Sequence, residues 1–151
     1  YYKDEAKTAK TFPTIDGVRY SIPGDFVRVE ADGSLTLLGR GSVCINTAGE
    51  KVFPEEVEEV LKRHAAVRDS AVCGIPNARF GEEIAALVEL SGNAGIPDAA
   101  ELVAHVKDHL AGYKAPRNVL VVERIPRAPN GKMDYKTVKE LALDAFGESA
   151  A

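Results

Sequence analysis

Two apolar runs lie at the centre of the sequence, at residues 67–75 and 84–90, with the loop 76–81 between them. A helix needs about 20 consecutive apolar residues to span a membrane, and neither run approaches that length. Short apolar runs bounded by turn residues are typical of strands in a globular core. We therefore expect two strands here and no transmembrane segment in the chain.

The segment before these strands has the pattern of an amphipathic helix. Pro54 falls at the expected first position of the helix, where proline does not destabilise it, and Glu55 and Glu56 follow. Lys62 and Arg63 fall in the last turn, so both ends match the helix dipole. Apolar residues recur at the spacing of one helix face, at Val57, Val60 and Leu61. The pattern predicts a helix that begins at residue 54 and covers the sheet.

Two more helices and a third strand are expected towards the end of the chain. Asp98 and Glu101 resemble a capping box, and the helix that they begin should end near Gly112. The run at residues 118–123 contains consecutive apolar residues, which predicts a strand buried on both faces. Asp134 is placed to cap a last helix.

The first third of the chain is less regular. Residues 1–33 contain several turn signals and weak periodicity, which predict short strands and loops. A further strand is expected at residues 35–38, followed by a hairpin made from residues 43–46 and 50–53. The order of elements predicts the α+β class, with a three-stranded sheet covered by helices plus a β-hairpin.

Charge and side-chain spacing argue against several kinds of site. The net charge of −4 and the isoelectric point of about 5.4 are unlike those of a nucleic-acid-binding protein. Cys44 and Cys73 lie in unrelated contexts, so we interpret both as reduced thiols. His105 and His109 have the i, i+4 spacing that can hold a metal, but the sequence offers no third ligand. We predict no metal site.

Three short motifs stand out, and each has an ordinary structural explanation when taken alone. Residues 129–132 (Pro-Asn-Gly-Lys) form a tight turn that projects one cation, most simply a solvated lysine. Gly24-Asp25 and Gly39-Arg40 read most simply as turn residues. Residues 45–58 form a glycine-containing hairpin that leads into an acidic helix. Such a hairpin can also line a channel for an extended ligand, because glycine allows close approach.

In this order the motifs are specific, and they resemble the C-terminal signatures of the adenylate-forming superfamily. That superfamily includes acyl- and aryl-CoA synthetases, luciferases and the adenylation domains of peptide synthetases. Residues 67–72 and 80–83 also resemble family stretches, and residues 39–46 are most similar to fatty-acyl and steroid-acyl CoA ligases. The resemblance covers nearly the whole chain, which is identified as the C-terminal portion of an acyl-CoA synthetase.

The resemblance implies a division of the chain. Residues 1–38 would be the last strands and loops of the large N-terminal adenylation domain, residues 39–148 the mobile C-terminal lid domain, and residues 149–151 a tail. The chain begins at Tyr1 without a methionine, and we expect it to be a fragment. The fragment should be inactive alone, because the acyl pocket and phosphate loop of the family belong to the N-terminal part.

The resemblance also implies a reaction in two steps. Family members activate a carboxylate with ATP, release pyrophosphate, and then pass the acyl group from AMP to the thiol of CoA. Lys132 is implied to be catalytic in the first step, where its ammonium offsets the repulsion between carboxylate and α-phosphate. Asp25 is implied to accept hydrogen bonds from the ribose hydroxyls, and Arg40 to contact the nucleotide. Ser42 falls at the hinge on which the lid turns, where the family usually has a charged residue.

The second step involves the hairpin. With the lid turned, Ala48 and Gly49 are implied to flank the pantetheine arm of CoA, where the family often has two glycines. Asn46 and Lys51 occupy hairpin positions that help to hold AMP or CoA in related ligases.

The expected cofactors are ATP and CoA, with Mg²⁺ accompanying ATP but bound outside this fragment. The expected partners are a carboxylic-acid substrate and the N-terminal domain of the same polypeptide, without a nucleic acid. Arg79 and Arg117 either meet CoA phosphates or are solvated cations. The expected location is the cytoplasm, or a peripheral position at a membrane.

Two alternatives stay open. The first is an adenylating enzyme that loads a carrier protein, or an acyl-AMP ligase, which would share the hinge and hairpin. The second is a non-catalytic α+β interaction domain with a chance turn before Lys132. The choice between a fatty acid and a steroid acid belongs to the acyl pocket, outside this segment.

Overall fold

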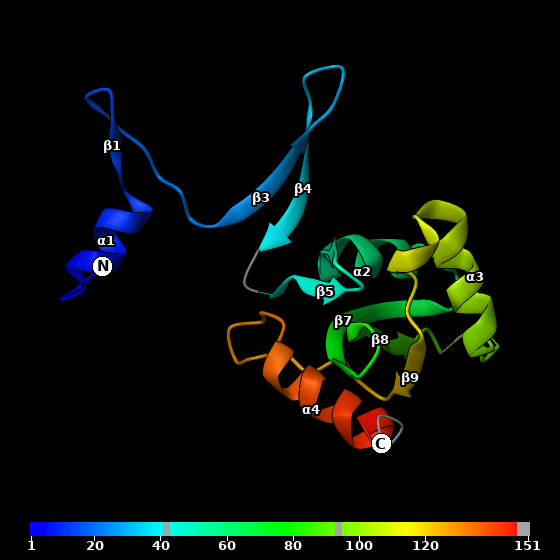
Figure 1. Cartoon of the computed structure of the whole chain (residues 1–151). Coiled ribbons are helices and arrows are strands. Elements are labelled where there is room, and N and C mark those ends of the chain that lie inside the picture. Colours follow the sequence, from blue (N-terminus) through cyan, green and yellow to red (C-terminus); the bar gives the residue numbers. More distant parts are fainter. Residues whose placement is uncertain (41–42, 93–94, 148–151) are drawn as a thin grey trace. The chain divides into compact units, whose positions relative to one another are not determined.

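The computed structural model describes residues 1–40, 43–92 and 95–147, and the chain divides into two compact units (Figure 1). The first unit is Tyr1–Ser42 and the second is Val43–Ala151. Within the described ranges, no helix combines the length and apolar character that crossing a membrane requires.

In its described residues 1–40, the first unit contains one short helix and two β-ribbons. Its elements are α1 (Glu5–Thr11), β1 (Thr14–Ile15), β2 (Val18–Arg19), β3 (Asp25–Val29) and β4 (Leu35–Arg40). The prediction of only strands and loops over residues 1–33 missed α1. This helix forms because the Asp4 carboxylate accepts a hydrogen bond from the Lys7 backbone N–H at 2.8 Å, which caps its first turn.

Strands β3 and β4 form an antiparallel ribbon with an irregular register between Phe26 and Val27. Several of its apolar side chains are exposed: Phe26, Val27, Val29, Leu35 and Leu37. An isolated two-stranded ribbon is marginally stable in water, so these side chains need a covering surface.

The second unit is built on a five-stranded sheet. Its strands are β5 (Ile45–Thr47), β6 (Glu50–Val52), β7 (Val67–Asn77), β8 (Gly81–Leu90) and β9 (Asn118–Val122). The central pair β7–β8 is antiparallel, while β9 runs parallel to β8. The predicted three strands correspond to β7, β8 and β9, and the predicted hairpin β5–β6 joins them through the pair Thr47 and Gly81.

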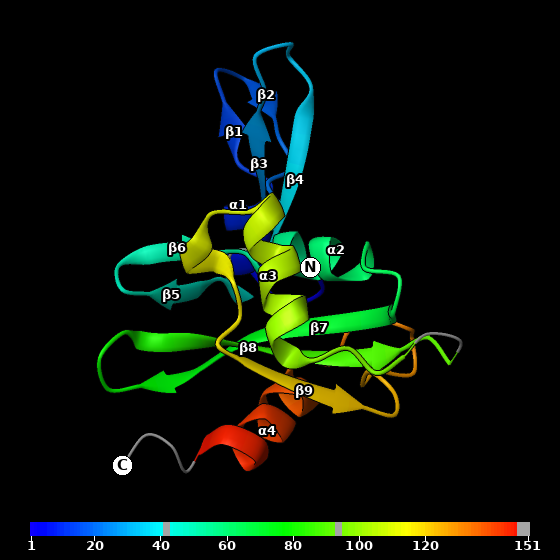
Figure 2. The same ribbon diagram turned by 90° about the vertical axis from the view of Figure 1, so that its right-hand side faces the viewer.

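Among the described residues, three α-helices and the 3₁₀ turn η2 accompany this sheet. They are α2 (Pro54–Lys62), α3 (Ala99–His109), η2 (Gly112–Lys114) and α4 (Tyr135–Phe146). Figure 2 shows α2 and α3 on one side of the sheet and α4 on the other. Asp98 and Asp134 cap their helices as predicted, since the Asp98 carboxylate accepts from Ala100 N and the Asp134 carboxylate from Thr137 N. The predicted reciprocal bond to the Glu101 carboxylate is not formed between these described residues, because that carboxylate lies 3.3 Å from His64 Nε2, and α3 ends at His109, three residues before Gly112. The α+β class is therefore confirmed.

Successive side chains of β7 and β8 enter two different core clusters. The α2–α3 cluster includes Val72, Ala86, Val88, Leu61 and Val106. The α4 cluster includes Ala71, Cys73, Leu87, Val138 and Ala142. Because successive side chains of a strand point to opposite faces, the clusters cover the two faces of one sheet. This explains why both strands are continuously apolar in sequence.

The expectation that residues 118–123 are buried on both faces is wrong. Strand β9 is only partly buried, and the Val121 side chain is 47% exposed. Among the described residues, β9 pairs with β8 alone, so it forms an edge of the sheet. Its apolar run therefore reflects β-propensity as well as burial.

Candidate functional site

Lys132 lies in a small closed loop between β9 and α4, which we call the lysine loop (residues 127–133). Its ends are joined by a bridge between Arg127 and Met133, and Ala128 N donates to Lys132 O at 2.8 Å. Gly131 has a φ of +80°, which glycine adopts without strain. The Lys132 N–H donates to Asn130 Oδ1 at 3.1 Å, and the lysine is exposed. The Pro-Asn-Gly turn thus holds the backbone at Lys132 in one shape.

The chain after the lysine loop is tied to the core by Tyr135. Its hydroxyl donates to Glu58 Oε1 at 3.2 Å, and Val72 N donates to the same oxygen at 2.8 Å. Glu58 is only 5% exposed, and this burial raises its pKa to about 7, although both hydrogen bonds oppose the shift. Burial and the neighbouring Glu58 carboxylate raise the pKa of Tyr135. The sequence does not indicate this contact, because Tyr135 and Glu58 lie 77 residues apart.

The β5–β6 hairpin turns through Ala48 and Gly49, whose φ angles are +52° and +84°. Positive φ at both central residues is typical of a two-residue type I′ turn. Asn46 and Lys51 lie opposite each other across the hairpin, and both are exposed.

The hairpin is fixed to the loop between β7 and β8. Ala48 N donates to Phe80 O at 2.9 Å, and Asn46 N donates to Glu82 Oε2 at 3.0 Å. Glu82 also lies 3.6 Å from Lys139 Nζ of α4. The sequence showed Glu82 only as part of a family stretch, because its partners are far away along the chain.

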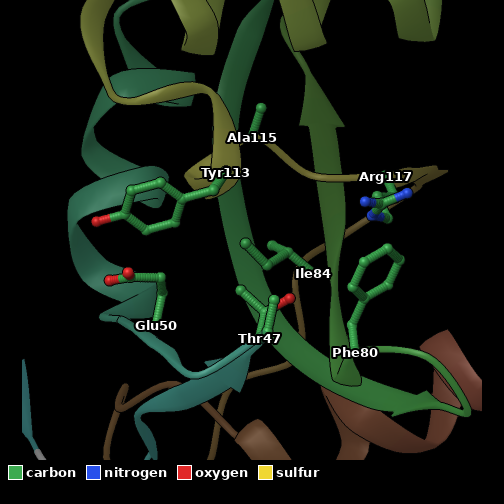
Figure 3. Close-up of a pocket in the computed structure, with 8 residues that line it drawn as sticks. Thr47, Glu50, Phe80, Ile84, Tyr113, Ala115 and Arg117 are labelled. Carbon is green, nitrogen blue, oxygen red and sulfur yellow. The ribbon is translucent and has the colours of Figure 1, made fainter.

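A cavity of about 200 Å³ opens beside this hairpin. Its lining residues are Thr47, Ala48, Glu50, Phe80, Ile84, Tyr113, Ala115 and Arg117. Figure 3 shows the Tyr113 ring and Glu50 along one side, with Phe80 and Arg117 across from them. The Arg117 guanidinium stacks over the Phe80 ring at 4.2 Å. The cavity therefore combines two aromatic rings with the Arg117 cation and the Glu50 carboxylate.

The candidate nucleotide residues belong to the first unit. Asp25 begins β3 and Arg40 ends β4, and the two are direct partners across the ribbon. The register thus brings the Gly-Asp and Gly-Arg motifs together at one end of the ribbon. The predicted hinge residue, Ser42, lies outside the described residues.

The two histidines of α3 have other partners. His105 Nε2 lies 3.0 Å from Val60 O, and His109 Nδ1 lies 2.8 Å from His105 O. Carbonyl oxygens only accept hydrogen bonds, so each of these nitrogens carries a proton and is not available to a metal. The described part of the chain contains no cluster of His, Cys, Asp or Glu arranged to hold a metal ion.

Comparisons with known proteins identify relatives over most of the chain. The family model of the AMP-binding enzyme C-terminal domain matches residues 56–132. A protein of Mycolicibacterium smegmatis named "Medium/long-chain-fatty-acid--CoA/3-oxocholest-4-en-26-oate--CoA ligase" is 56% identical over 141 residues. A Rhodococcus rhodochrous protein named "3-oxocholest-4-en-26-oate--CoA ligase" is 54% identical over 140 residues. Each alignment covers 93% of this chain and 25% of the relative, so the chain spans about a quarter of their length.

A solved structure shows the same fold. The crystal structure of apo MatB from Rhodopseudomonas palustris matches 97% of this chain with a TM-score of 0.78 and 32% identity. The match covers 28% of the MatB chain.

Proposed function

The chain belongs to the family of AMP-binding enzyme C-terminal domains, and on that premise we propose that it is the C-terminal part of an ATP-dependent acyl-CoA ligase. The ligase would convert a carboxylate and ATP into acyl-AMP and pyrophosphate, and then transfer the acyl group to CoA. The names of the two ligase relatives support a medium- or long-chain fatty acid or a steroid acid as substrate. We place the enzyme in the cytoplasm or peripherally at a membrane.

The observation that carries this proposal is the exposed Lys132 on a rigid loop of the matched segment. Joining a carboxylate to the α-phosphate of ATP brings two anions together, and a cation placed between them lowers that barrier. An ammonium on a flexible stem suits this task, because Lys132 must arrive for the first step and leave before the second.

We propose that CoA binds along the hairpin and the adjoining cavity. The pantetheine arm would pass the turn at Ala48 and Gly49, with Asn46 and Lys51 nearby. The adenine would stack against Phe80 or Tyr113, since aromatic rings bind bases by stacking. Arg117 would pair with a CoA phosphate, for which a guanidinium has matching geometry.

The remaining roles rest on the family resemblance and on the first unit. Asp25 and Arg40 would contact the ribose and nucleotide, and their pairing across the β3–β4 ribbon supports a shared site. Ser42 would be the hinge between residues 1–38, which would complete the N-terminal domain, and residues 39–148, which would be the lid. The exposed apolar side chains of the ribbon support a covering domain. Mg²⁺ would enter with ATP and be held by that domain.

The test compares both half-reactions in the full-length enzyme. Lys132→Ala should lower acyl-AMP formation, measured by ATP–pyrophosphate exchange, by roughly 10²–10³-fold. Thioester formation from supplied acyl-AMP should persist. Lys136→Ala is the matched control, because Lys136 is an exposed lysine of α4 that lies 3.9 Å from Glu140, and both half-reactions should be unchanged.

Other outcomes would favour the alternatives. Normal pyrophosphate exchange in Lys132→Ala would mean that the turn is a chance match in an interaction domain. Formation of acyl-AMP without any thioester from free CoA would point to a carrier protein as acceptor.

A further inference from the structure

One guanidinium connects the lysine loop to the central sheet. Arg127 Nη2 donates to Asp69 Oδ2 at 2.6 Å, and Arg127 Nη1 donates to Gly131 O at 3.1 Å. Gly131 immediately precedes Lys132, so the contact is made one residue from the lysine. Asp69 lies 58 residues away in sequence, in β7.

Asp69 is itself held in place. It follows an irregularity in the pairing of β7 with β8, and its second oxygen, Oδ1, accepts from Ser70 N at 2.9 Å. Its side chain is 20% exposed, so the carboxylate is partly shielded from water. The anchor is therefore a fixed carboxylate on a rigid strand.

The other bonds of the lysine loop have a different effect. Those from Ala128 N to Lys132 O and from Gly131 N to Ala128 O lie within the loop. They define the shape of the loop, but they do not tie it to the sheet. The C-terminal end of the loop is held by Met133, which packs against the α4 cluster, and by the bond from Tyr135 to Glu58. The Arg127 guanidinium holds the tip, because its N–H groups lie in one plane and bond Asp69 of the strand and Gly131 O at once.

We propose that Arg127, held by Asp69, is a positioning residue that aims Lys132 for acyl-AMP formation. The inference rests on the proposed function. Its physical basis is that a catalytic group displaced by about 1 Å can lose about 100-fold in rate. Asp69 balances the charge of Arg127, so the arginine acts through geometry and not as a second cation on the phosphates.

The experiment uses the full-length enzyme and measures both half-reactions. Arg127→Met should lower acyl-AMP formation about 10- to 100-fold, mainly in kcat. Thioester formation from supplied acyl-AMP should be unchanged, because Lys132 takes no part in it. Arg127→Lys keeps the positive charge but cannot bond Asp69 and Gly131 O with two coplanar N–H groups. Its rate of acyl-AMP formation should therefore be little higher than that of Arg127→Met. Asp69→Asn should also lower the rate of acyl-AMP formation, because it weakens the contact that holds Arg127 while the charge of Arg127 is kept.

A matched control is available next to the anchor. Arg68 is the neighbour of Asp69 in sequence, and it pairs with Glu89 at 3.4 Å. Within the part of the chain that the structure describes, no hydrogen bond or ion pair joins Arg68 to the lysine loop. Arg68→Met removes an arginine of the same sheet edge and should leave both half-reactions at the wild-type level.

Lys132→Ala separates this inference from the proposed function. If Lys132→Ala keeps normal acyl-AMP formation, the proposed function fails. If Lys132→Ala loses it but Arg127→Met does not, or if Arg127→Met slows both half-reactions equally, the positioning role is overturned.

A double variant tests whether Arg127 acts through the lysine. Adding Arg127→Met to Lys132→Ala should cost no further rate, because the lysine to be positioned is gone. An additional loss of the full size would mean that Arg127 touches the substrate itself and would overturn the proposal.

Discussion

Ala48 is the non-glycine residue of the hairpin turn that has a positive φ, at +52°. An L-residue in this conformation costs roughly 1–2 kcal/mol, because its Cβ crowds the following carbonyl. We expect Ala48→Gly to raise the free energy of unfolding of the 151-residue chain by about 1 kcal/mol, measured by urea denaturation.

Gly49→Ala is the converse change. A Cβ at Gly49 would meet no atom within 4 Å, so any loss of stability in this variant comes from the φ of +84° alone. This variant should be less stable than the wild type by a similar amount. A more stable Gly49→Ala protein would contradict the type I′ turn.

Glu58 should make the stability of the chain depend on pH. Burial raises its pKa from the ordinary value of 4.5 to about 7. The native state therefore holds a proton that the unfolded state releases, and stability falls as pH rises from 4.5 to 7. The loss should total about 3 kcal/mol. Glu58→Gln cannot ionise, so its stability relative to the wild type should rise between pH 5 and pH 8.

Glu59 provides the control for this measurement. It is an exposed neighbour on α2 that pairs with Lys62. Glu59→Gln, which also removes one carboxyl from α2, is measured in parallel as the reference. A flat difference between Glu58→Gln and the wild type would show that the buried carboxyl does not hold its proton.

At the scale of elements, Glu82 joins the hairpin to β8 and α4. Its carboxylate accepts from Asn46 N and lies near Lys139 Nζ. Glu82→Ala removes both contacts, so the hairpin should become less fixed. We expect slower thioester formation from supplied acyl-AMP, by about 10-fold, in the full-length enzyme. Acyl-AMP formation should be unaffected.

Glu82→Gln separates the two contacts. The glutamine oxygen can still accept from Asn46 N, while the charge facing Lys139 is lost. This variant should transfer the acyl group at nearly the wild-type rate. If Glu82→Ala slowed acyl-AMP formation and thioester formation equally, the hairpin would have no specific role in the second half-reaction.

The sequence was sufficient to predict the α-helices and strands of the second unit, but not the 3₁₀ turn η2. Apolar periodicity placed α2, and Asp98 and Asp134 marked the starts of α3 and α4. Pairing was harder to predict, because strand order depends on contacts between distant segments. The parallel position of β9 beside β8 and its partial exposure were therefore not visible in the apolar run alone.

The same limit applies to the candidate site. Lys132 and the Ala48–Gly49 turn were found because each belongs to a local motif. Arg127 lies two residues before the Pro-Asn-Gly-Lys motif and Glu82 lies within a family-like stretch, but their partners are 58 and 36 residues away. No local pattern indicates such a contact, so only the folded chain shows which side chains hold the motifs in place.

At the scale of the whole molecule, the two units differ in their ability to fold alone. The second unit has a buried core on both faces of its sheet, whereas the first exposes the apolar side chains of its ribbon. Residues 43–147 expressed alone should therefore unfold cooperatively in urea. A peptide of residues 1–42 should show no cooperative transition. Loss of cooperativity in residues 43–147 would mean that folding of the second unit depends on the first.

The sheet with two covered faces has a consequence for how such a chain can evolve. Met133 of the lysine loop packs with the α4 cluster, while Ile45 and Val52 of the hairpin belong to the α2–α3 cluster. Under the proposed function, substitutions that adapt the hairpin to a new acceptor would fall mainly in a different packing environment from those that support the lysine, and distant sites contribute nearly additively to stability. Acceptor preference would then be able to diverge among descendants of one ancestor while the lysine loop is inherited unchanged.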